Sequence, residues 1–210
     1  MPVQSIENIA DLVRRCDQRG LARALTIAEN GGAQAAALLH SLFDPGRGGR
    51  TVGVTGPPGA GKSTLVDRLL LRWRKAGRRI GVVAVDPSSP FSGGALLGDR
   101  LRMQDHACDP GVFIRSMGSR GHVGGLADAT AQVAEVMAAA GFDPVVLETV
   151  GVGQGEVEVA ALADVTVLVL VPGLGDEVQA MKAGIMEIGD LIVLNKADNP
   201  GMDQLESAVR

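Results

Sequence analysis

Aromatic residues are scarce in this 210-residue chain, which has one Trp, four Phe and no Tyr. Proteins that bind single-stranded nucleic acid usually stack the bases on such rings. The net charge of −4 also argues against a surface that binds a phosphate backbone. The densest basic cluster, residues 68–79, is interpreted as the solvated face and C-terminal end of a helix, where cations oppose the helix dipole. We therefore expect no nucleic-acid partner.

Cysteines are equally few. Cys16 and Cys108 share no close spacing with each other or with histidine, which favours neither a disulfide framework nor a zinc site. No apolar run reaches the roughly 20 residues of a membrane-spanning helix, and residues 1–16 lack the apolar block of a secretory signal peptide. These absences favour a cytoplasmic globular protein that does not enter a membrane, and the 46% hydrophobic composition is ample for one buried core.

The chain divides into two parts by hydrophobic period. Apolar residues at helical spacing in residues 5–42 predict about three short helices, separated at Gly20 and at Gly31 and Gly32. Residues 1–45 are therefore expected to form a helical N-terminal extension. After a turn-rich linker, short β-branched runs alternate with helical stretches through residues 46–210, the expected main domain.

The predicted strands are residues 50–55, 79–86, 112–116, 144–149, 165–171 and 191–195. The predicted helices between them are residues 63–76, 95–106, 123–140, 155–163 and 177–188. The strand runs are continuously apolar, which is typical of strands buried on both faces of a parallel sheet. We therefore expect an α/β fold of the P-loop NTPase kind, with a mostly parallel open sheet flanked by helices, whose ligand binds beyond the carboxyl ends of the strands.

The segment GPPGAGKST, residues 56–64, lies between a predicted strand and a predicted helix and fits the pattern G-x-x-x-x-G-K-[ST]. Glycines in such a loop let successive backbone N–H groups surround phosphate oxygens, and the helix that follows presents its positive end to the same anion. Lys62 is expected to reach the β and γ phosphates, and the Ser63 hydroxyl to bind Mg²⁺. The residues expected to contact the nucleotide here are Gly56, Pro57, Gly59, Ala60, Gly61, Lys62, Ser63 and Thr64.

A magnesium ion needs further oxygen ligands. Asp86 and Glu148 each end a predicted strand, so both are expected at the carboxyl edge of the sheet beside residues 56–64. Asp99 lies in a loop-to-helix segment and is a third candidate. Glu148 also has the place of a Walker-B acid, and the amide of Gly151 that follows it is expected to sense the γ phosphate.

Asn195, Lys196 and Asp198 belong to the motif N-K-x-D, directly after the last predicted strand. In this arrangement the aspartate accepts hydrogen bonds from the ring N–H and the exocyclic amine of guanine, the lysine stem packs along the ring, and the asparagine supports the loop and the base edge. Adenine does not offer this pair of donors, and a site built around a required hydrogen bond rejects an analogue by roughly 10⁴-fold. The expected ligand is GTP or GDP rather than ATP.

With these motifs in place, the chain resembles the MeaB/ArgK family of P-loop GTPases, whose human member is the methylmalonic aciduria type A protein. The resemblance runs from about residue 20 to residue 205 and includes long segments that generic GTPases lack. These segments are residues 85–103, 113–130, 148–164 and 171–198.

The resemblance implies a GTPase that acts as a chaperone for an adenosylcobalamin-dependent acyl-CoA mutase, typically methylmalonyl-CoA mutase, gating cofactor loading and protecting the enzyme. It implies metal-associated roles for Asp86, Asp99 and Glu148. It also implies that residues 113–130, 148–156 and 174–184 change with the bound nucleotide or communicate with the mutase. Family members usually continue beyond this point with a region used for dimerisation. Because this chain stops at Arg210, we expect that region to be missing and the homodimer to be in doubt.

Hydrolysis of GTP requires positioning and charge neutralisation, which Lys62, Mg²⁺ and the loop amides are expected to supply. Lys62, Glu148 and Gln154 are the predicted catalytic residues, with Gln154 in a glycine-rich segment as the candidate that orients the attacking water. Hydrolysis without a partner is expected to be slow. Two alternatives remain open: a kinase linked to amino-acid transport, which needs an acceptor site that no motif marks, and a nucleotide-binding module that does not hydrolyse.

Overall fold

The sheet and its covering helices are described by a computed structural model that covers residues 5–45, 49–86, 106, 108–118, 125–149, 160–173 and 185–209. The strands are β1 (Thr51–Thr55), β2 (Ile80–Asp86), β3 (Val112–Gly118), β4 (Val145–Thr149), β5 (Val165–Leu170) and β6 (Leu191–Leu194). They form one sheet in the order β3-β2-β4-β1-β5-β6, and neighbouring strands pair in parallel throughout this order. The predicted fold class is confirmed.

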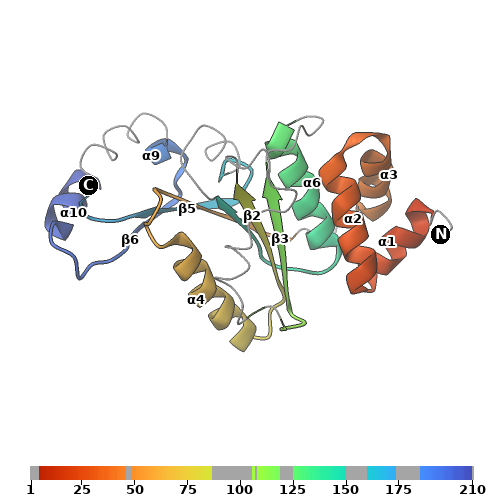
Figure 1. Cartoon of the computed structure of the whole chain (residues 1–210), viewed down its shortest axis with the longest axis horizontal. Coiled ribbons are helices and arrows are strands. Elements are labelled where there is room, and N and C mark those ends of the chain that lie inside the picture. Colours follow the sequence, from red (N-terminus) through yellow and green to blue (C-terminus); the bar gives the residue numbers. More distant parts are fainter. Residues whose placement is uncertain are drawn as a thin grey trace.

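Helices cover both faces of this sheet (Figure 1). On one face, α4 (Lys62–Lys75) packs on Val54, Val82 and Val146. On the other face, α6 (Gly125–Ala139) buries Val133 and Met137 against the sheet, where Leu147 belongs to the same core. Near the last strands lie α9 (Ile185–Ile188) and α10 (Met202–Val209). The helix α10, which the sequence did not predict, packs through Leu205 on β5.

Three N-terminal helices stand beside α6: α1 (Ile6–Arg14), α2 (Gln18–Asn30) and α3 (Gly32–Leu42). Their buried residues, among them Leu21 and Leu38, share one hydrophobic core with α6 and the sheet. An ion pair between Glu29 of α2 and Arg115 of β3 adds a polar link. The N-terminal helices are thus packed directly on the sheet domain.

Gly20 does not separate two helices, contrary to the prediction. It lies inside α2, which begins after Asp17, and the Asp17 carboxylate accepts a 2.7 Å hydrogen bond from the Gly20 amide. A Cβ atom at Gly20 would collide with the side chain of Leu12 on α1. The glycine therefore allows close contact between two helices. This requirement depends on tertiary packing, so the position of a glycine in the local sequence does not reveal it.

The prediction that the last strand is buried on both faces is also wrong. β6 is an edge strand, Leu191 is 57% exposed, and Ile192 is exposed as well. An apolar run of this length is compatible with either a central or an edge strand, because the sequence does not give the strand order.

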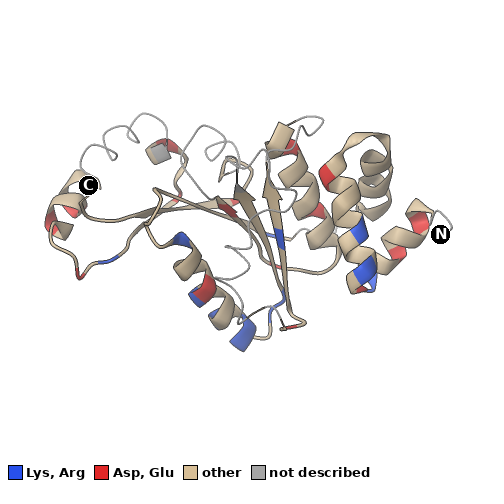
Figure 2. Cartoon of the chain, in the orientation of Figure 1, with Lys and Arg blue, Asp and Glu red and all other residues tan. Residues whose placement is uncertain are grey.

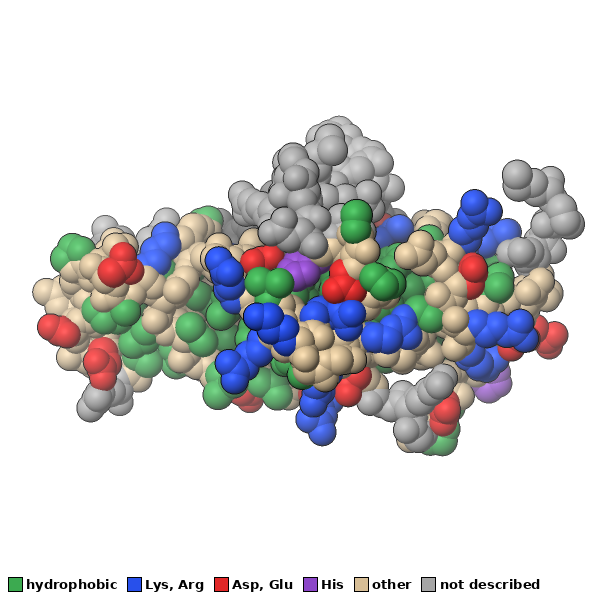
Figure 3. Space-filling model, turned by 90° about the horizontal axis from the view of Figure 1, so that it is seen from below, with side chains coloured by type: hydrophobic (Ala, Val, Ile, Leu, Met, Phe, Trp, Pro, Cys, Tyr) green, Lys and Arg blue, Asp and Glu red, His purple; other side chains and the backbone are tan. Residues whose placement is uncertain are grey.

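Basic residues lie along α4 and at its C-terminal end (Figure 2). In the view from below, Lys and Arg side chains gather across the middle of this face (Figure 3). Arg72, Arg74 and Lys75 lie in the last turn, where they oppose the helix dipole. The Nε atom of Arg74 also donates a 2.8 Å hydrogen bond to Asp109, and this contact lowers the pKa of Asp109 and raises the pKa of Arg74.

Candidate nucleotide-binding site

The loop from Gly56 to Gly61 joins the carboxyl end of β1 to the start of α4. Gly56 has φ 140°, and a Cβ atom there would collide with the carbonyl oxygen of Val169 on β5. Gly61 has φ 90° and precedes the first helical residue. Glycine is required at both positions, because L side chains rarely adopt these backbone angles. The loop therefore lies tightly against the carboxyl edge of the sheet.

The first turn of α4 faces this loop. Within the described residues, no side-chain hydrogen bond caps the helix, and its ladder of backbone hydrogen bonds begins with the Leu65 amide, which donates to the Gly61 carbonyl at 2.9 Å. The amides of Lys62, Ser63 and Thr64 precede that ladder. Helix amides in this position, together with the helix dipole, form a favourable environment for an anion.

Lys62 brings a cation to the same place. Its side chain is buried, and Nζ donates hydrogen bonds to the carbonyl oxygens of Gly56 at 2.5 Å and Pro57 at 3.1 Å. The ammonium group is thus held inside the loop, beside the helix amides. This is the arrangement expected for residues that bind the phosphates of a nucleotide.

Ser63 and Glu148 meet across the sheet edge. The parallel pairing of β1 with β4 places Glu148 opposite Val54, and the Ser63 hydroxyl donates a 2.5 Å hydrogen bond to Glu148 Oε1. Glu148 is only 2% exposed. A hydroxyl and a carboxylate are oxygen ligands of the kind that Mg²⁺ takes. The two residues therefore fit a magnesium site and are positioned to share one ion.

The other predicted metal and catalytic residues are less fully described. The backbone of Asp86 ends β2, two strands from β1, but its side chain lies outside the described part of the structure. Asp99, Gly151 and Gln154 lie entirely outside it. Within the described residues, no three or more His, Cys, Asp or Glu side chains gather into a potential metal site. Ser63 and Glu148 are therefore the described part of the predicted metal site.

The N-K-x-D segment follows β6 and returns to the phosphate loop. The Asn195 amide group donates a 2.8 Å hydrogen bond from Nδ2 to the Ala60 carbonyl. Lys196 has φ 54°, and its carbonyl accepts a 2.9 Å hydrogen bond from the Asn199 amide, which closes a turn. Asp198 lies in this turn and is exposed. The predicted base-binding segment and the predicted phosphate-binding loop are thus in direct contact.

Two further contacts near the site were not predicted. The buried hydroxyls of Thr55 and Thr149 form a 3.2 Å hydrogen bond between the ends of β1 and β4. Asp67 lies one helical turn after Ser63, and its Oδ1 atom is 3.1 Å from Nε2 of the buried His106 ring. Each pair joins residues that are distant in sequence, so no local pattern could have revealed either contact.

A central parallel strand, a glycine-rich loop ending in Lys-Ser and an open helix N-terminus define the P-loop NTPase class of proteins. Residues 21–210 match the family model described as "Methylmalonyl Co-A mutase-associated GTPase MeaB". The chain belongs to this family, which confirms the resemblance stated from the sequence.

Individual relatives agree with this assignment. A protein of Pyrococcus abyssi (strain GE5 / Orsay), whose name describes it as a candidate GTPase, is 52% identical over 198 residues, covering 94% of this chain and 61% of the relative. The mouse (Mus musculus) protein "Methylmalonic aciduria type A homolog, mitochondrial" is 45% identical over 147 residues, covering 70% of this chain and 35% of the relative.

Among solved structures, a crystal structure titled "LAO/AO transport system kinase" superposes with a TM-score of 0.69 and 32% identity. It covers 99% of this chain, and the chain covers 62% of it. This chain therefore spans about three fifths of the length of the Pyrococcus relative and of this solved structure.

Proposed function

We propose that this protein binds GTP with Mg²⁺ and hydrolyses it to GDP and phosphate. The observation that carries the proposal is the convergence of Lys62, the Ser63–Glu148 pair and the open N-terminus of α4 at the loop that Asn195 contacts. Gly56, Pro57, Gly59, Ala60, Gly61 and Thr64 complete the proposed phosphate site. Lys196 and Asp198 are the proposed guanine-binding residues, beside Asn195.

In the proposed reaction, water attacks the γ phosphorus while the bond between this phosphorus and the β–γ bridging oxygen breaks, giving GDP and phosphate. Lys62 and the helix amides neutralise the negative charge that develops on the phosphate oxygens. Ser63 and Glu148, with Asp86 and Asp99, are the proposed holders of Mg²⁺, which when bound neutralises the charge on the β and γ phosphates. Gln154 is the proposed residue that orients water, and Gly151 the proposed sensor of the γ phosphate.

The proposed biological role is that of a cytoplasmic chaperone for an adenosylcobalamin-dependent acyl-CoA mutase, of the methylmalonyl-CoA mutase type. The description of the matching family as mutase-associated supports this partner. Under this proposal the GTPase controls cofactor loading and protects the mutase, and the mutase accelerates a slow intrinsic hydrolysis.

Two measurements test these proposals separately. Phosphate release from GTP with Mg²⁺ is measured for the wild type and for Lys62→Ala, and we expect slow release that the variant abolishes. The same assay is then repeated with purified methylmalonyl-CoA mutase, which is expected to accelerate release. Radiolabelled phosphate that appears on a protein or small molecule instead of in solution would favour the kinase alternative. Binding without release in either assay would favour the nonhydrolysing module.

A further inference from the structure

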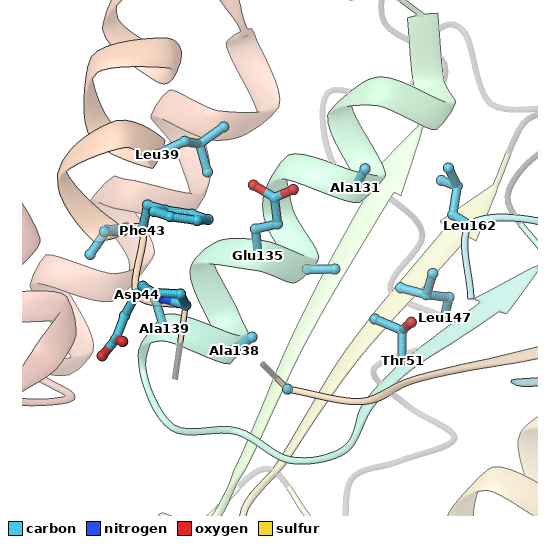
Figure 4. Close-up of a pocket in the computed structure, with 14 residues that line it drawn as sticks. Leu39, Phe43, Asp44, Thr51, Ala131, Glu135, Ala138, Ala139, Leu147 and Leu162 are labelled. Atoms are coloured by element: carbon cyan, nitrogen blue, oxygen red, sulfur yellow. The ribbon is translucent and has the colours of Figure 1, made fainter. Parts of the chain in front are cut away.

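A cavity of about 430 Å³ opens on the face of the sheet that α6 covers (Figure 4). The end of α3, the α6 helix, the start of β1 and the middle of β4 line it. Its volume falls in the range of pockets that bind ligands or partner side chains. None of the residues described above for the nucleotide site lines this cavity.

The walls of the cavity are mostly apolar. On α6 they consist of alanines, including Ala131 and Ala134, beside the single longer side chain of Glu135, so most of this wall is recessed. Leu147 and Leu162 line the sheet side. Phe43 follows α3 at the rim and is 76% exposed. An aromatic ring left so open to water beside an apolar hollow is typical of a surface that a partner covers.

The charged residues described in the cavity lining are acidic. Glu135 of α6 and Asp44 contribute carboxylates, and no Lys, Arg or His is among the described residues that line it. In Figure 4 the Glu135 carboxylate points into the space between α6 and α3. Its side chain has no hydrogen bond or ion pair within the described part of the chain, and burial raises its pKa. A cation placed here would offset the cost of keeping this carboxylate ionised.

We propose that this cavity is a docking site for a segment of a partner protein that presents a large apolar side chain next to a lysine or arginine. The apolar side chain would fill the hollow over the alanines of α6 and cover Phe43. The neighbouring cation would lie against Glu135. Apolar anchors that enter a pocket, flanked by a complementary charge, supply both affinity and specificity at such sites.

The cavity and the candidate nucleotide site share two strands. Leu147 lines the cavity, and the next residue of β4, Glu148, holds Ser63 on the opposite face of the sheet. Thr51 lines the cavity at the start of β1, and the same strand leads into the loop at Gly56. A segment bound in the cavity therefore contacts the strands that position the Ser63–Glu148 pair.

A selection of random short peptides displayed on phage tests the proposal. Wild-type protein serves as the bait, and Ala131→Trp, which fills the cavity, serves for counter-selection. The substitution Ala76→Trp is the matched control, since Ala76 is exposed at the end of α4 on the other face. The enriched peptides are then synthesised, and their affinities for the wild type, Glu135→Gln, Phe43→Ala and the two tryptophan variants are measured by calorimetry.

We expect the selected peptides to share a large apolar residue close to a lysine or arginine. Their affinity should fall by about tenfold or more for Ala131→Trp and for Phe43→Ala, and should stay unchanged for Ala76→Trp. Glu135→Gln should lower the affinity for cationic peptides and leave the affinity for neutral analogues unchanged. This variant keeps the test informative if Ala131→Trp fails to fold.

Three outcomes would overturn the proposal. The first is that no peptide distinguishes the wild type from the filled or Glu135→Gln variants. The second is an acidic consensus, or one that is indifferent to Glu135. The third is self-association of the wild type, seen by sedimentation and lost in Ala131→Trp, which would make a second copy of this chain the occupant.

Discussion

Asn195 and Ala60 are 135 residues apart in the chain, and the Asn195 side chain donates a 2.8 Å hydrogen bond to the Ala60 carbonyl. The contact joins the segment after β6 to the loop after β1, although β5 lies between these strands in the sheet. Under the proposed function, the part of the site that reads the base is thereby fixed to the part that binds the phosphates.

Replacing Asn195 with alanine should loosen this connection. The lost hydrogen bond is worth about 1 kcal/mol, so GTP affinity is expected to fall by roughly fivefold to tenfold. Asn195→Asp is the matched variant, because it keeps the shape of the side chain and removes the donor. Calorimetric titration with GTP checks the expectation, and unchanged affinity in both variants would mean that the contact does not support the site.

Gly56→Ala should damage the phosphate loop much more than Gly59→Ala. Both glycines have positive φ, but only at Gly56 does a Cβ atom collide with backbone, at the Val169 carbonyl, whereas at Gly59 no atom lies within 4 Å. At Gly59 φ is 74°, near the left-handed region, where a non-glycine residue costs about 1–2 kcal/mol. At Gly56 φ is 140°, which L side chains rarely adopt, so the difference between the variants measures this added strain together with the collision. Urea unfolding and GDP titration measure it, and equal losses in the two variants would contradict the described loop geometry.

Asp198→Asn should change which base is bound. Under the proposed function, the Asp198 carboxylate accepts two hydrogen bonds from guanine. The substitution makes it an amide that can donate a hydrogen bond itself, and xanthine has a carbonyl where guanine has its exocyclic amine. We expect a loss of GTP affinity of roughly a hundredfold or more, with improved binding of xanthosine triphosphate. Competition binding with GTP and xanthosine triphosphate measures this change in preference. A variant that still prefers the guanine nucleotide would show that Asp198 does not bind the base.

Glu135 should make stability depend on pH. Because burial raises its pKa, the folded protein binds this proton more tightly than the unfolded chain does. Ionisation of Glu135 therefore destabilises the fold as pH rises through the raised pKa, and the penalty disappears below the unfolded pKa of about 4.3. Glu135→Gln should accordingly raise the melting temperature near pH 7 and have little effect near pH 4. The opposite trend in thermal unfolding would contradict the described burial.

Much of this architecture was predictable from the sequence because its signals are local. Continuous β-branched runs identified all the strands of the described sheet, and the spacing of Gly56, Gly61 and Lys62 identified the loop between β1 and α4. The position of Glu148 at the end of its strand was also predicted, since a strand-terminal residue of a parallel sheet lies at a known edge.

The features that the sequence did not reveal depend on which elements meet. Gly20 resembles a helix break, but it is the contact point of α1 and α2. The exposure of Leu191 follows from the strand order, which the sequence does not give. The cavity beside Glu135 is formed by α3, α6 and the sheet together, so no pattern within one segment of the sequence could predict it.

The central claim is that the loop from Gly56 to Thr64 binds a triphosphate whose base is selected by Asp198. Isothermal titration of the folded protein with GTP and with ATP, each with and without Mg²⁺, tests it most directly, with Lys62→Ala as the control that removes the loop cation. The account predicts magnesium-dependent binding of GTP that is far tighter than binding of ATP and is lost in the control. Equal affinity for the two nucleotides, or no binding of either by folded protein, would contradict it.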